Sequence, residues 1–374
     1  MTGTLVGARR VVIKIGSALL ADDAGALKAD WLTALAQDIG DLHKSGVQIL
    51  VVSSGAIAIG RRLLGLARGP RNRALRLEES QAAAATGQIR LAHAWQNALA
   101  QHDVSVAQVL LTIEDTENRR RYLNARSTMA TLLRLGVVPV INENDTVATD
   151  EIRFGDNDRL AGRVAQMMEA DACILLTDVD GLYTADPNTD LGACLVPEVH
   201  KITPELEAMA GEPRTADGSG GMITKLDAAR VSMAAGCRLA IADGRDLHPL
   251  AALNSGKECT WFMPAAEPRT ARKRWIAGSL KPVGVLVIDD GAARALVDGK
   301  SLLPAGITSV EGNFDRGDPV VIREFSGKEF GRGLCAYGAE DARRIAGHKS
   351  SEIENILGYR GREEVIHRDD LTLN

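Results

Sequence analysis

The stretch VVPVINENDTVATDEIRFGDND, residues 137–158, joins a pattern typical of a buried strand to a long polar segment. Residues 137–141 are uncharged and mostly β-branched, which predicts a buried parallel strand. The chain then continues with four polar residues, NEND, that end at Asp145. Because open α/β sheets bind ligands at the carboxyl ends of their strands, we expect a ligand site here. A plain Asx turn leading into a helix capped at Asp156 would use the same residue types.

A second polar cluster, GDND at residues 155–158, opens a predicted helix. Carboxylate and amide side chains suit a small ligand with an ammonium group, or a hydrated Mg²⁺ ion. They do not suit a bare phosphate group, because like charges repel. Phosphate-binding residues must therefore lie elsewhere in the chain.

The composition bounds the class of protein. The chain has 374 residues, enough for two domains, and its formal net charge of −5 gives no electrostatic support to polyanion binding. No apolar run approaches the roughly 18 residues that a membrane span requires. Charged residues interrupt the first apolar residues, so we expect no secretory signal. Five separated cysteines without a CxxC pair indicate free thiols in a reducing cytoplasm and no structural zinc site.

Strand-like and helix-like segments alternate over residues 1–263, which predicts a three-layer α/β/α domain with a mostly parallel sheet. The expected strands are residues 11–15, 47–52, 104–111, 137–141, 172–176 and 239–241, and the expected helices are residues 28–44, 78–100, 124–135 and 160–169. We expect the polar stretch 114–121 to be a connector whose arginines face solvent or another subunit.

Two strand ends offer groups that could bind an anion. Lys14 lies near the end of the first expected strand, and although it could simply extend into solvent, Gly16 close behind it favours contact with phosphate. The second strand leads into SSGA, residues 53–56, where hydroxyl groups and the first N–H groups of a helix can hold an anion. A serine N-cap followed by a closely packed glycine explains those letters equally well.

The segment GSGGMITK, residues 218–225, contains three glycines that let the backbone approach a ligand closely. A helix beginning near Ile223 would point its N-terminus at that ligand and carry Lys225 in its first turn. The alternative is a flexible hinge, and the segment does not match the GxxxxGK[ST] phosphate loop. TDVDG, residues 177–181, follows another strand and could line a base or ribose, although alone it is only a turn signal.

The composition changes after the α/β pattern ends. Residues 264–280 form an expected linker that includes the basic cluster at residues 269–274. Beyond residue 281, short strands broken by Gly, Pro and Asp predict a small, mostly β module. Acidic and basic residues nearly balance over residues 281–360, so this module lacks the basic excess of an RNA-binding surface.

These parts together favour phosphoryl transfer. That reaction needs in-line positioning and positive charge on the moving group rather than covalent help from the protein. Two lysines and a glycine-rich helix N-terminus supply the charge, and the Asp and Asn clusters can hold the acceptor. We found no sequence pattern for a Ser-His-Asp, Cys-His or metal-hydrolase site.

Several motifs in a fixed order also resemble those of a known family. These are VVIKIGS, SSGAIAIG, SQAAAATGQ, RYLNAR, INENDTVAT, GDND, LLTDVDGLYTADP and GSGGMITKL. Together they look like the glutamate 5-kinases, a branch of the amino acid kinase family. The later segments LLPAGI, GDPV and GRGLCAYGAEDARRIAG resemble the PUA domain that such enzymes often carry. The likeness covers nearly the whole chain.

The resemblance implies ATP-dependent phosphorylation of the γ-carboxylate of L-glutamate to L-glutamate 5-phosphate, the first step of proline biosynthesis. Mg²⁺ would be carried by ATP, with no protein side chain assigned to it. The residues that match the family motifs are Lys14, Lys225 and Asp158 for catalysis, Ser54, Gly55, Asp145 and Asn157 for glutamate, and Thr177, Asp178, Ser219, Gly220, Gly221, Met222, Ile223 and Thr224, with both lysines, for ATP.

The resemblance further implies feedback inhibition by proline, a homo-oligomer (dimer or tetramer) and hand-over of the labile product to a reductase. We expect neither RNA nor a membrane among the partners. The expected domains are residues 1–263 for the kinase, 264–280 for the linker, 281–360 for the PUA-like module and 361–374 for a tail. The segment KECTWF, residues 257–262, departs from the family pattern and leaves the first boundary open.

Two alternatives remain open from the sequence. Acetylglutamate kinase or another amino acid kinase would share the fold, but those relatives tend to have two glycines where this chain has Gly16 and Ser17. An RNA-binding or RNA-modifying protein would use the PUA-like module, with the basic linker as its only electrostatic support.

Overall fold

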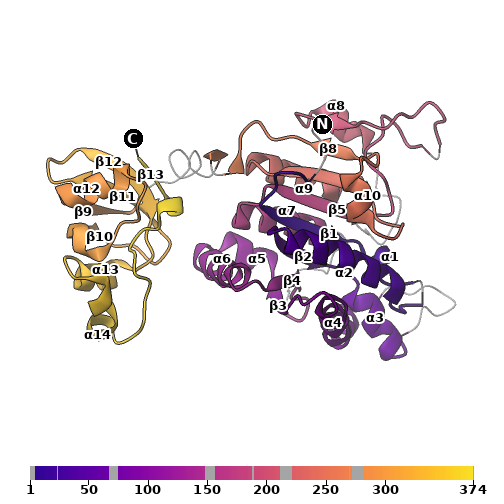
Figure 1. Ribbon diagram of the computed structural model, residues 1–374, viewed down its shortest axis with the longest axis horizontal. Coiled ribbons are helices and arrows are strands. Elements are labelled where there is room, and N and C mark those ends of the chain that lie inside the picture. Colours follow the sequence, from indigo (N-terminus) through magenta and orange to yellow (C-terminus); the bar gives the residue numbers. More distant parts are fainter. Residues whose placement is uncertain are drawn as a thin grey trace. The chain divides into compact units, whose positions relative to one another are not determined.

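The computed structural model describes residues 5–22, 24–66, 75–147, 156–187, 189–210, 221–268, 270–271 and 282–373. The chain divides into two compact units (Figure 1). The first unit comprises residues 1–117 and 124–268, and the second comprises Arg269–Asn374 together with Asn118–Leu123. The division after Pro268 lies within the range that we predicted to be a linker.

The first unit is built on one sheet of eight strands in the order β3-β4-β2-β1-β5-β7-β8-β6. The strands are β1 (Arg10–Ile15), β2 (Gln48–Ser53), β3 (Val106–Leu111), β4 (Val138–Glu143), β5 (Ala172–Thr177), β6 (Glu198–Val199), β7 (Arg238–Asp243) and β8 (Thr260–Phe262). All neighbours pair in parallel except β7 and β8, which are antiparallel. The predicted mostly parallel sheet is confirmed.

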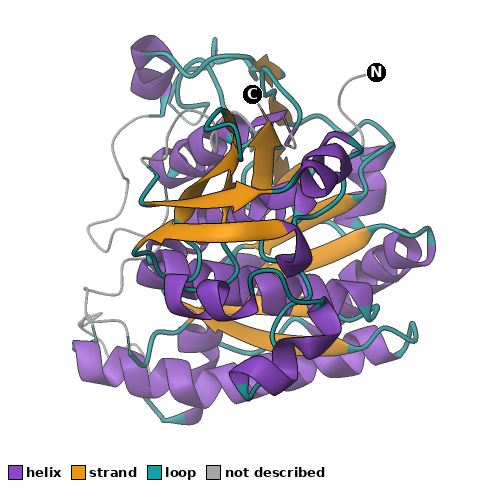
Figure 2. Cartoon of the chain, turned by 90° about the vertical axis from the view of Figure 1, so that its left-hand side faces the viewer, coloured by secondary structure: helices purple, strands orange, loops and turns teal. Residues whose placement is uncertain are grey.

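Helices cover both faces of this sheet (Figure 2). Their bounds are α1 (Ser17–Leu20), α2 (Ala29–Lys44), α3 (Ala56–Leu63), α4 (Leu77–Ala100), α5 (Ile113–Glu117), α6 (Arg119–Arg134), α7 (Asp156–Met168), α8 (Pro204–Met209), α9 (Met222–Ala234) and α10 (Pro249–Asn254). One packed group contains α2, α3, α4 and α10, whereas α7 and α9 pack on each other and on β1 and β7. This arrangement confirms the predicted three layers.

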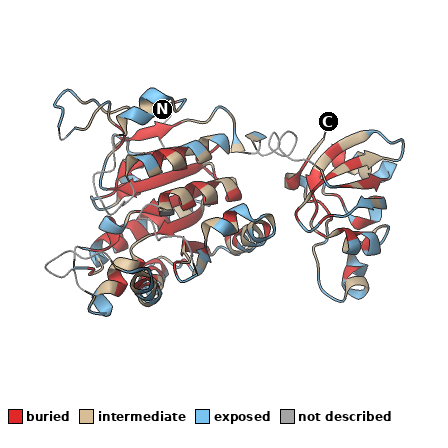
Figure 3. Ribbon diagram, turned by 180° about the vertical axis from the view of Figure 1, so that it is seen from behind, coloured by how far each residue is buried: buried red, intermediate tan, exposed pale blue. Residues whose placement is uncertain are grey.

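The two faces of β1 contact different helices, and this determines which helix Lys14 faces. Val11, Ile13 and Ile15 are fully buried and belong to the core shared with α2 and α4, which includes Trp95. Because successive residues of a strand point to opposite faces, Lys14 projects toward the other face, where α7 packs. Figure 3 shows the central strands mostly in the colour of buried residues.

Two glycines bring α3 and α4 into close contact. A Cβ atom added at Gly87 would lie 1.8 Å from the carbonyl oxygen of Ala56, and one added at Gly60 would lie 1.8 Å from that of Ala83. Both distances are far below van der Waals contact, so no larger residue fits without moving the backbone. The alanine- and glycine-rich segment at residues 81–88 therefore packs within the chain.

The second unit has a sheet of five strands in the order β10-β9-β11-β12-β13. Its elements are β9 (Gly284–Ile288), α12 (Asp290–Val297), β10 (Ile307–Gly312), β11 (Pro319–Glu324), β12 (Glu329–Leu334), α13 (Ala339–Ile345), α14 (Ile353–Leu357) and β13 (Leu371–Leu373), with short 3₁₀ turns at Pro304–Gly306, Ser350–Glu352 and Arg368–Asp370. β9 and β11 pair in parallel, and the other neighbours are antiparallel. β13 lies in the segment that we predicted to be a tail.

Two local expectations require correction. The predicted connector at residues 114–121 contains most of α5 and the first turn of α6. Glu and Arg are good helix formers, and the lack of an apolar repeat concealed them. The expected last strand, at residues 239–241, is followed by β8, and the short β6 completes the edge of the sheet. Strands of two or three residues are too short to show an alternating pattern.

No helix in the described ranges is long and apolar enough to cross a membrane. All five cysteines are free, and four of them are buried.

Candidate active site

Lys14, Asp158 and Lys225 meet at the carboxyl edge of the large sheet. Nζ of Lys14 lies 2.6 Å from Oδ1 of Asp158, and Nζ of Lys225 lies 3.2 Å from Oδ2 of the same carboxylate. All three residues are buried, with Asp158 only 1% exposed. One carboxylate thus bridges two ammonium groups that come from distant parts of the sequence.

Three different elements supply this cluster. Lys14 comes from β1, Asp158 is the third residue of α7, and Lys225 is the fourth residue of α9. The hydroxyl group of Thr224 donates to Oδ2 of Asp158 at 2.9 Å and lies 2.9 Å from the carbonyl oxygen of Gly221. The first turns of α7 and α9 are therefore joined directly at the site.

The electrostatics of the cluster favour an ionised Asp158. Burial would raise the pKa of Asp158, but the charges of Lys14 and Lys225 and the hydrogen bonds from Lys14 and Thr224 lower that pKa below its ordinary value. Two ammonium groups and one carboxylate leave a positive charge in a buried setting. Such a setting attracts an anionic ligand more strongly than an exposed lysine does.

Ser54 and Asn157 form a second pair next to the cluster. Nδ2 of Asn157 donates to Oγ of Ser54 at 3.0 Å. In the described part of the chain, Oδ1 of Asn157 is buried and has no hydrogen-bond partner. Gly55 follows with a φ of 99°, a conformation that favours glycine and turns the chain into α3. The pair therefore offers a buried acceptor oxygen to a ligand.

Asp145 lies two residues beyond β4, and β4 is the neighbour of β2. Its side chain is buried. Asn142, at the end of the same strand, donates to Gln88 of α4 at 2.6 Å and accepts from the backbone N–H of Glu143 at 2.9 Å. Ser54 and Asp145 thus follow adjacent strands, an arrangement that the sequence alone does not predict. Residues 148–155 of the predicted polar loop lie outside the described residues.

The predicted nucleotide residues lie on the other side of β1. Thr177 ends β5, and its hydroxyl group donates to Asp178 at 3.0 Å. Gly221, Met222, Ile223 and Thr224 form the start of α9. Gly221 precedes this helix of 13 residues and has no side chain that could cap it. The first N–H groups of α9 can therefore face an anion. Ser219 and Gly220 are outside the described residues.

One polar group at the same edge was missed by the sequence analysis. Asp243 ends β7, and Arg245, two residues later, donates to it from Nε and Nη2 at 2.9 Å each. The criterion that selected Asp145, polar residues directly after a buried strand, would also have selected this pair.

The comparison with known families follows the same division of the chain. Residues 9–243 match the model of the amino acid kinase family, which is more than half of the chain. The chain belongs to the amino acid kinase family. Residues 284–357 match the PUA domain, in agreement with the predicted C-terminal module.

Within that family, relatives that match this chain over nearly its whole length are glutamate 5-kinases. The glutamate 5-kinase of Paramagnetospirillum magneticum (strain AMB-1) is 64% identical over 370 residues, covering 99% of both chains. The glutamate 5-kinase of Rhodospirillum rubrum is 60% identical and covers 97% of this chain and 96% of that protein. The glutamate 5-kinase of Paracoccus denitrificans is 57% identical and covers 100% of this chain and 99% of that protein. The resemblance seen in the motifs is confirmed.

Proposed function

We propose that this amino acid kinase transfers the γ-phosphoryl group of ATP to the γ-carboxylate of L-glutamate and so forms L-glutamate 5-phosphate, the first step of proline biosynthesis. One observation carries the proposal: Lys14 and Lys225 converge on one carboxylate, 2.6 Å and 3.2 Å from its oxygens, at a buried strand edge. The high identity to glutamate 5-kinases selects glutamate among the acceptors of the family.

The two lysines supply the charge that phosphoryl transfer requires. A γ-carboxylate oxygen of glutamate attacks the γ-phosphorus of ATP, and the bond from that phosphorus to the bridging oxygen breaks, so that ADP leaves with its electron pair. Negative charge is spread over the oxygens of the moving group in the transition state. Lys14 and Lys225 stabilise that charge from fixed positions, because Asp158 holds both ammonium groups before ATP binds.

The acceptor needs no general base in this reaction. The γ-carboxyl group of glutamate has a pKa of about 4.3 and is already ionised at neutral pH. The site therefore has only to hold glutamate in line with the phosphorus. The buried carboxylate of Asp145 suits its α-ammonium group, and Asn157 and Ser54 offer further polar contacts.

A metal ion at this site would be held by the nucleotide and not by protein side chains. Both oxygens of Asp158 are engaged by lysines, and no group of three His, Cys, Asp or Glu residues in the described ranges could hold a metal. Mg²⁺ bound to the phosphates of ATP would neutralise part of their charge. Thr177, Asp178 and the start of α9 would hold the nucleotide itself.

The proposal also covers the location, oligomeric state, regulation and product hand-over of the enzyme. A cytoplasmic homo-oligomer, a dimer or tetramer, inhibited by proline, fits an enzyme at the start of a biosynthetic route. The product is a labile acyl phosphate, so hand-over to a reductase is part of the same proposal.

A coupled ADP-release assay tests the acceptor directly. The purified chain is incubated with Mg²⁺-ATP and, in separate reactions, L-glutamate, N-acetylglutamate, aspartate or UMP. We expect ADP release with glutamate, and hydroxylamine should trap the acyl phosphate as a hydroxamate. ADP release with another acceptor and none with glutamate would disprove the assignment.

A further inference from the structure

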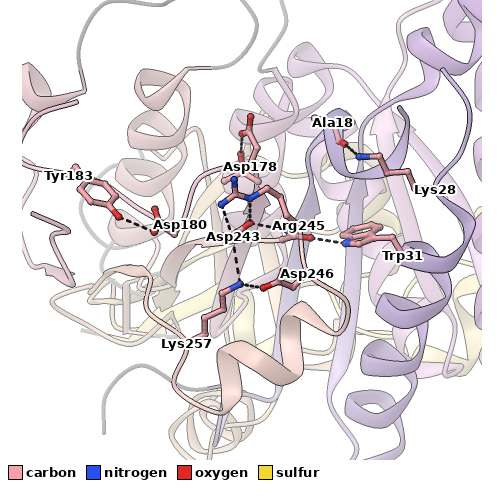
Figure 4. A network of polar contacts seen from close by, with 12 residues as sticks. Ala18, Lys28, Trp31, Asp178, Asp180, Tyr183, Asp243, Arg245, Asp246 and Lys257 are labelled. Atoms are coloured by element: carbon pink, nitrogen blue, oxygen red, sulfur yellow. Dashed lines mark hydrogen bonds and ion pairs between the residues drawn. The ribbon is translucent and has the colours of Figure 1, made fainter. Parts of the chain in front are cut away.

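Beyond the ends of β5 and β7 lies a charged cluster that, apart from Asp178, has no role in the proposed chemistry. Its members are drawn in Figure 4 and comprise Asp178, Asp180, Asp243, Arg245, Asp246 and Lys257. Tyr183 donates to Asp180 at 2.9 Å, and Nζ of Lys257 lies 2.8 Å from Asp246 and 3.7 Å from Asp243. The cluster stands at the same sheet edge as Lys14, displaced toward β7.

Arg245 is held in one orientation by Asp243. Nε and Nη2 each donate to one carboxylate oxygen at 2.9 Å, and the backbone N–H of Arg245 also donates to Oδ1 at 2.9 Å. The Asp243 side chain is only 10% exposed, whereas that of Arg245 is 62% exposed. This bidentate pair fixes the guanidinium plane and leaves part of it open to a ligand.

The position of Arg245 matches the far end of the proposed nucleotide. β7 is the second strand from β1, so the two strands lie roughly 10 Å apart. The triphosphate chain and the ribose of ATP together can cover that distance. The displacement is away from β2 and β4, whose ends carry the proposed glutamate residues.

The charges around Arg245 disfavour a phosphate group. The hydrogen bonds from Arg245 to Asp243, and then the charge of Asp243, raise the pKa of Arg245 most, and the charges of Asp180 and Asp178 raise that pKa further. The carboxylates of Asp178, Asp180, Asp243 and Asp246 outnumber the cations Arg245 and Lys257, so a phosphate would meet net repulsion. A nucleoside is uncharged, its ribose hydroxyl groups can donate to carboxylates, and its base has a flat face. The cluster therefore suits the nucleoside end of ATP.

We propose that Arg245 binds the base of ATP by stacking its guanidinium group, fixed by Asp243, against the face of the ring. The inference rests on the proposed function, since it assigns the nucleoside part of the same substrate. The planar guanidinium group of Arg stacks on flat aromatic rings, which makes it suited to contact a base. Asp243 acts as a positioning residue, because it orients Arg245.

Calorimetric titration with Mg²⁺-ADP tests the contact without requiring turnover. We expect Arg245→Ala to weaken ADP binding by roughly 10-fold, which corresponds to about 1.4 kcal/mol. Binding of inorganic tripolyphosphate, which has no nucleoside, should not change. The matched control is Arg230→Ala, because Arg230 is also a partly exposed arginine paired with carboxylates, those of Asp227 and Glu207. This control should bind ADP like the wild type.

The outcomes separate this inference from the proposed function. Wild-type protein that fails to bind ADP would overturn both. Wild-type binding of ADP together with unchanged binding by Arg245→Ala would overturn only the role of Arg245. An equal loss of tripolyphosphate binding would show a phosphate contact instead. Arg245→Lys keeps the charge but not the plane, so wild-type affinity in that variant would exclude stacking.

Discussion

The carboxylate of Asp158 lies 2.6 Å from the ammonium group of Lys14, and both side chains are at least nine-tenths buried. Lys225 approaches the other oxygen of the same carboxylate at 3.2 Å. A buried ion pair adds little net stability, because desolvation of the charges offsets their attraction. Under the proposed function, Asp158 would serve to orient both lysines at the strand edge before ATP binds.

Replacing Asp158 should therefore impair both stability and turnover. We expect Asp158→Asn to lower the free energy of unfolding by about 3–5 kcal/mol, because two buried ammonium groups lose their counter-charge. We also expect kcat to fall by roughly 10² or more as the lysines lose their fixed positions. Urea unfolding and the ADP-release assay measure the two effects. Wild-type values in both would show that Asp158 does not organise the lysines.

The pH dependence of stability gives the same variant a second test. The pKa of Asp158 is lowered in the folded protein, so its ionisation stabilises the fold above the unfolded pKa of about 3.9. That contribution is lost as the pH falls through the lower, folded pKa. The difference in unfolding free energy between wild type and Asp158→Asn should hence be largest near neutral pH and shrink in acid. A difference that stays constant down to pH 3 would contradict the shift.

Removing the second lysine should affect chemistry more than folding. We expect Lys225→Ala to lower kcat by roughly 10² or more, because one preorganised charge on the transition state is lost. The melting temperature reports whether the fold persists. Lys44, an exposed lysine at the end of α2, provides a matched control, and Lys44→Ala should turn over normally. Normal turnover by Lys225→Ala would remove Lys225 from the reaction.

Asp145 should act mainly on glutamate binding. We expect Asp145→Ala to raise the KM for glutamate by roughly 10-fold or more with a smaller effect on kcat, because the α-ammonium group loses its buried counter-charge. The KM for ATP, measured at saturating glutamate, serves as the internal control. If the KM for glutamate is unchanged, Asp145 is only a turn residue.

Ser54 and Asn157 should act as a unit, because they are hydrogen-bonded at 3.0 Å. We expect Ser54→Ala and Asn157→Ala each to raise the KM for glutamate, and the double variant to raise it by less than the product of the two factors. A double-mutant cycle on kcat/KM for glutamate measures the coupling. Strictly multiplicative effects would argue that the two side chains contact glutamate independently.

Much of the first unit could be predicted from apolar runs and their spacing. β1, β2, β4 and β5 consist mainly of buried β-branched and aliphatic residues. Such runs can be recognised as strands from the sequence alone. The polar residues that follow such strands were found by the same logic. The glycine-rich segment before α9 predicted the start of that helix to within one residue.

The remaining features depend on how distant segments pair. Spacing alone does not state that β1 lies between β2 and β5, and that order is what brings Lys14 to the start of α7. β6 and β8 are too short for a periodic signal. Asp243 and Arg245 are two positions apart in the sequence, and their pairing matches no known motif. Only the structure shows that Asp243 fixes the orientation of the Arg245 guanidinium group.

The place of β1 in the sheet also matters while the chain is being synthesised. β2, the partner of one edge of β1, follows soon after it in the chain, whereas β5, the partner of the other edge, is synthesised much later. An open apolar edge invites pairing with a second nascent chain, and charged side chains on such an edge oppose it. Arg10 and Lys14 are the two charges on β1, so the ammonium group proposed to meet ATP would also oppose such pairing.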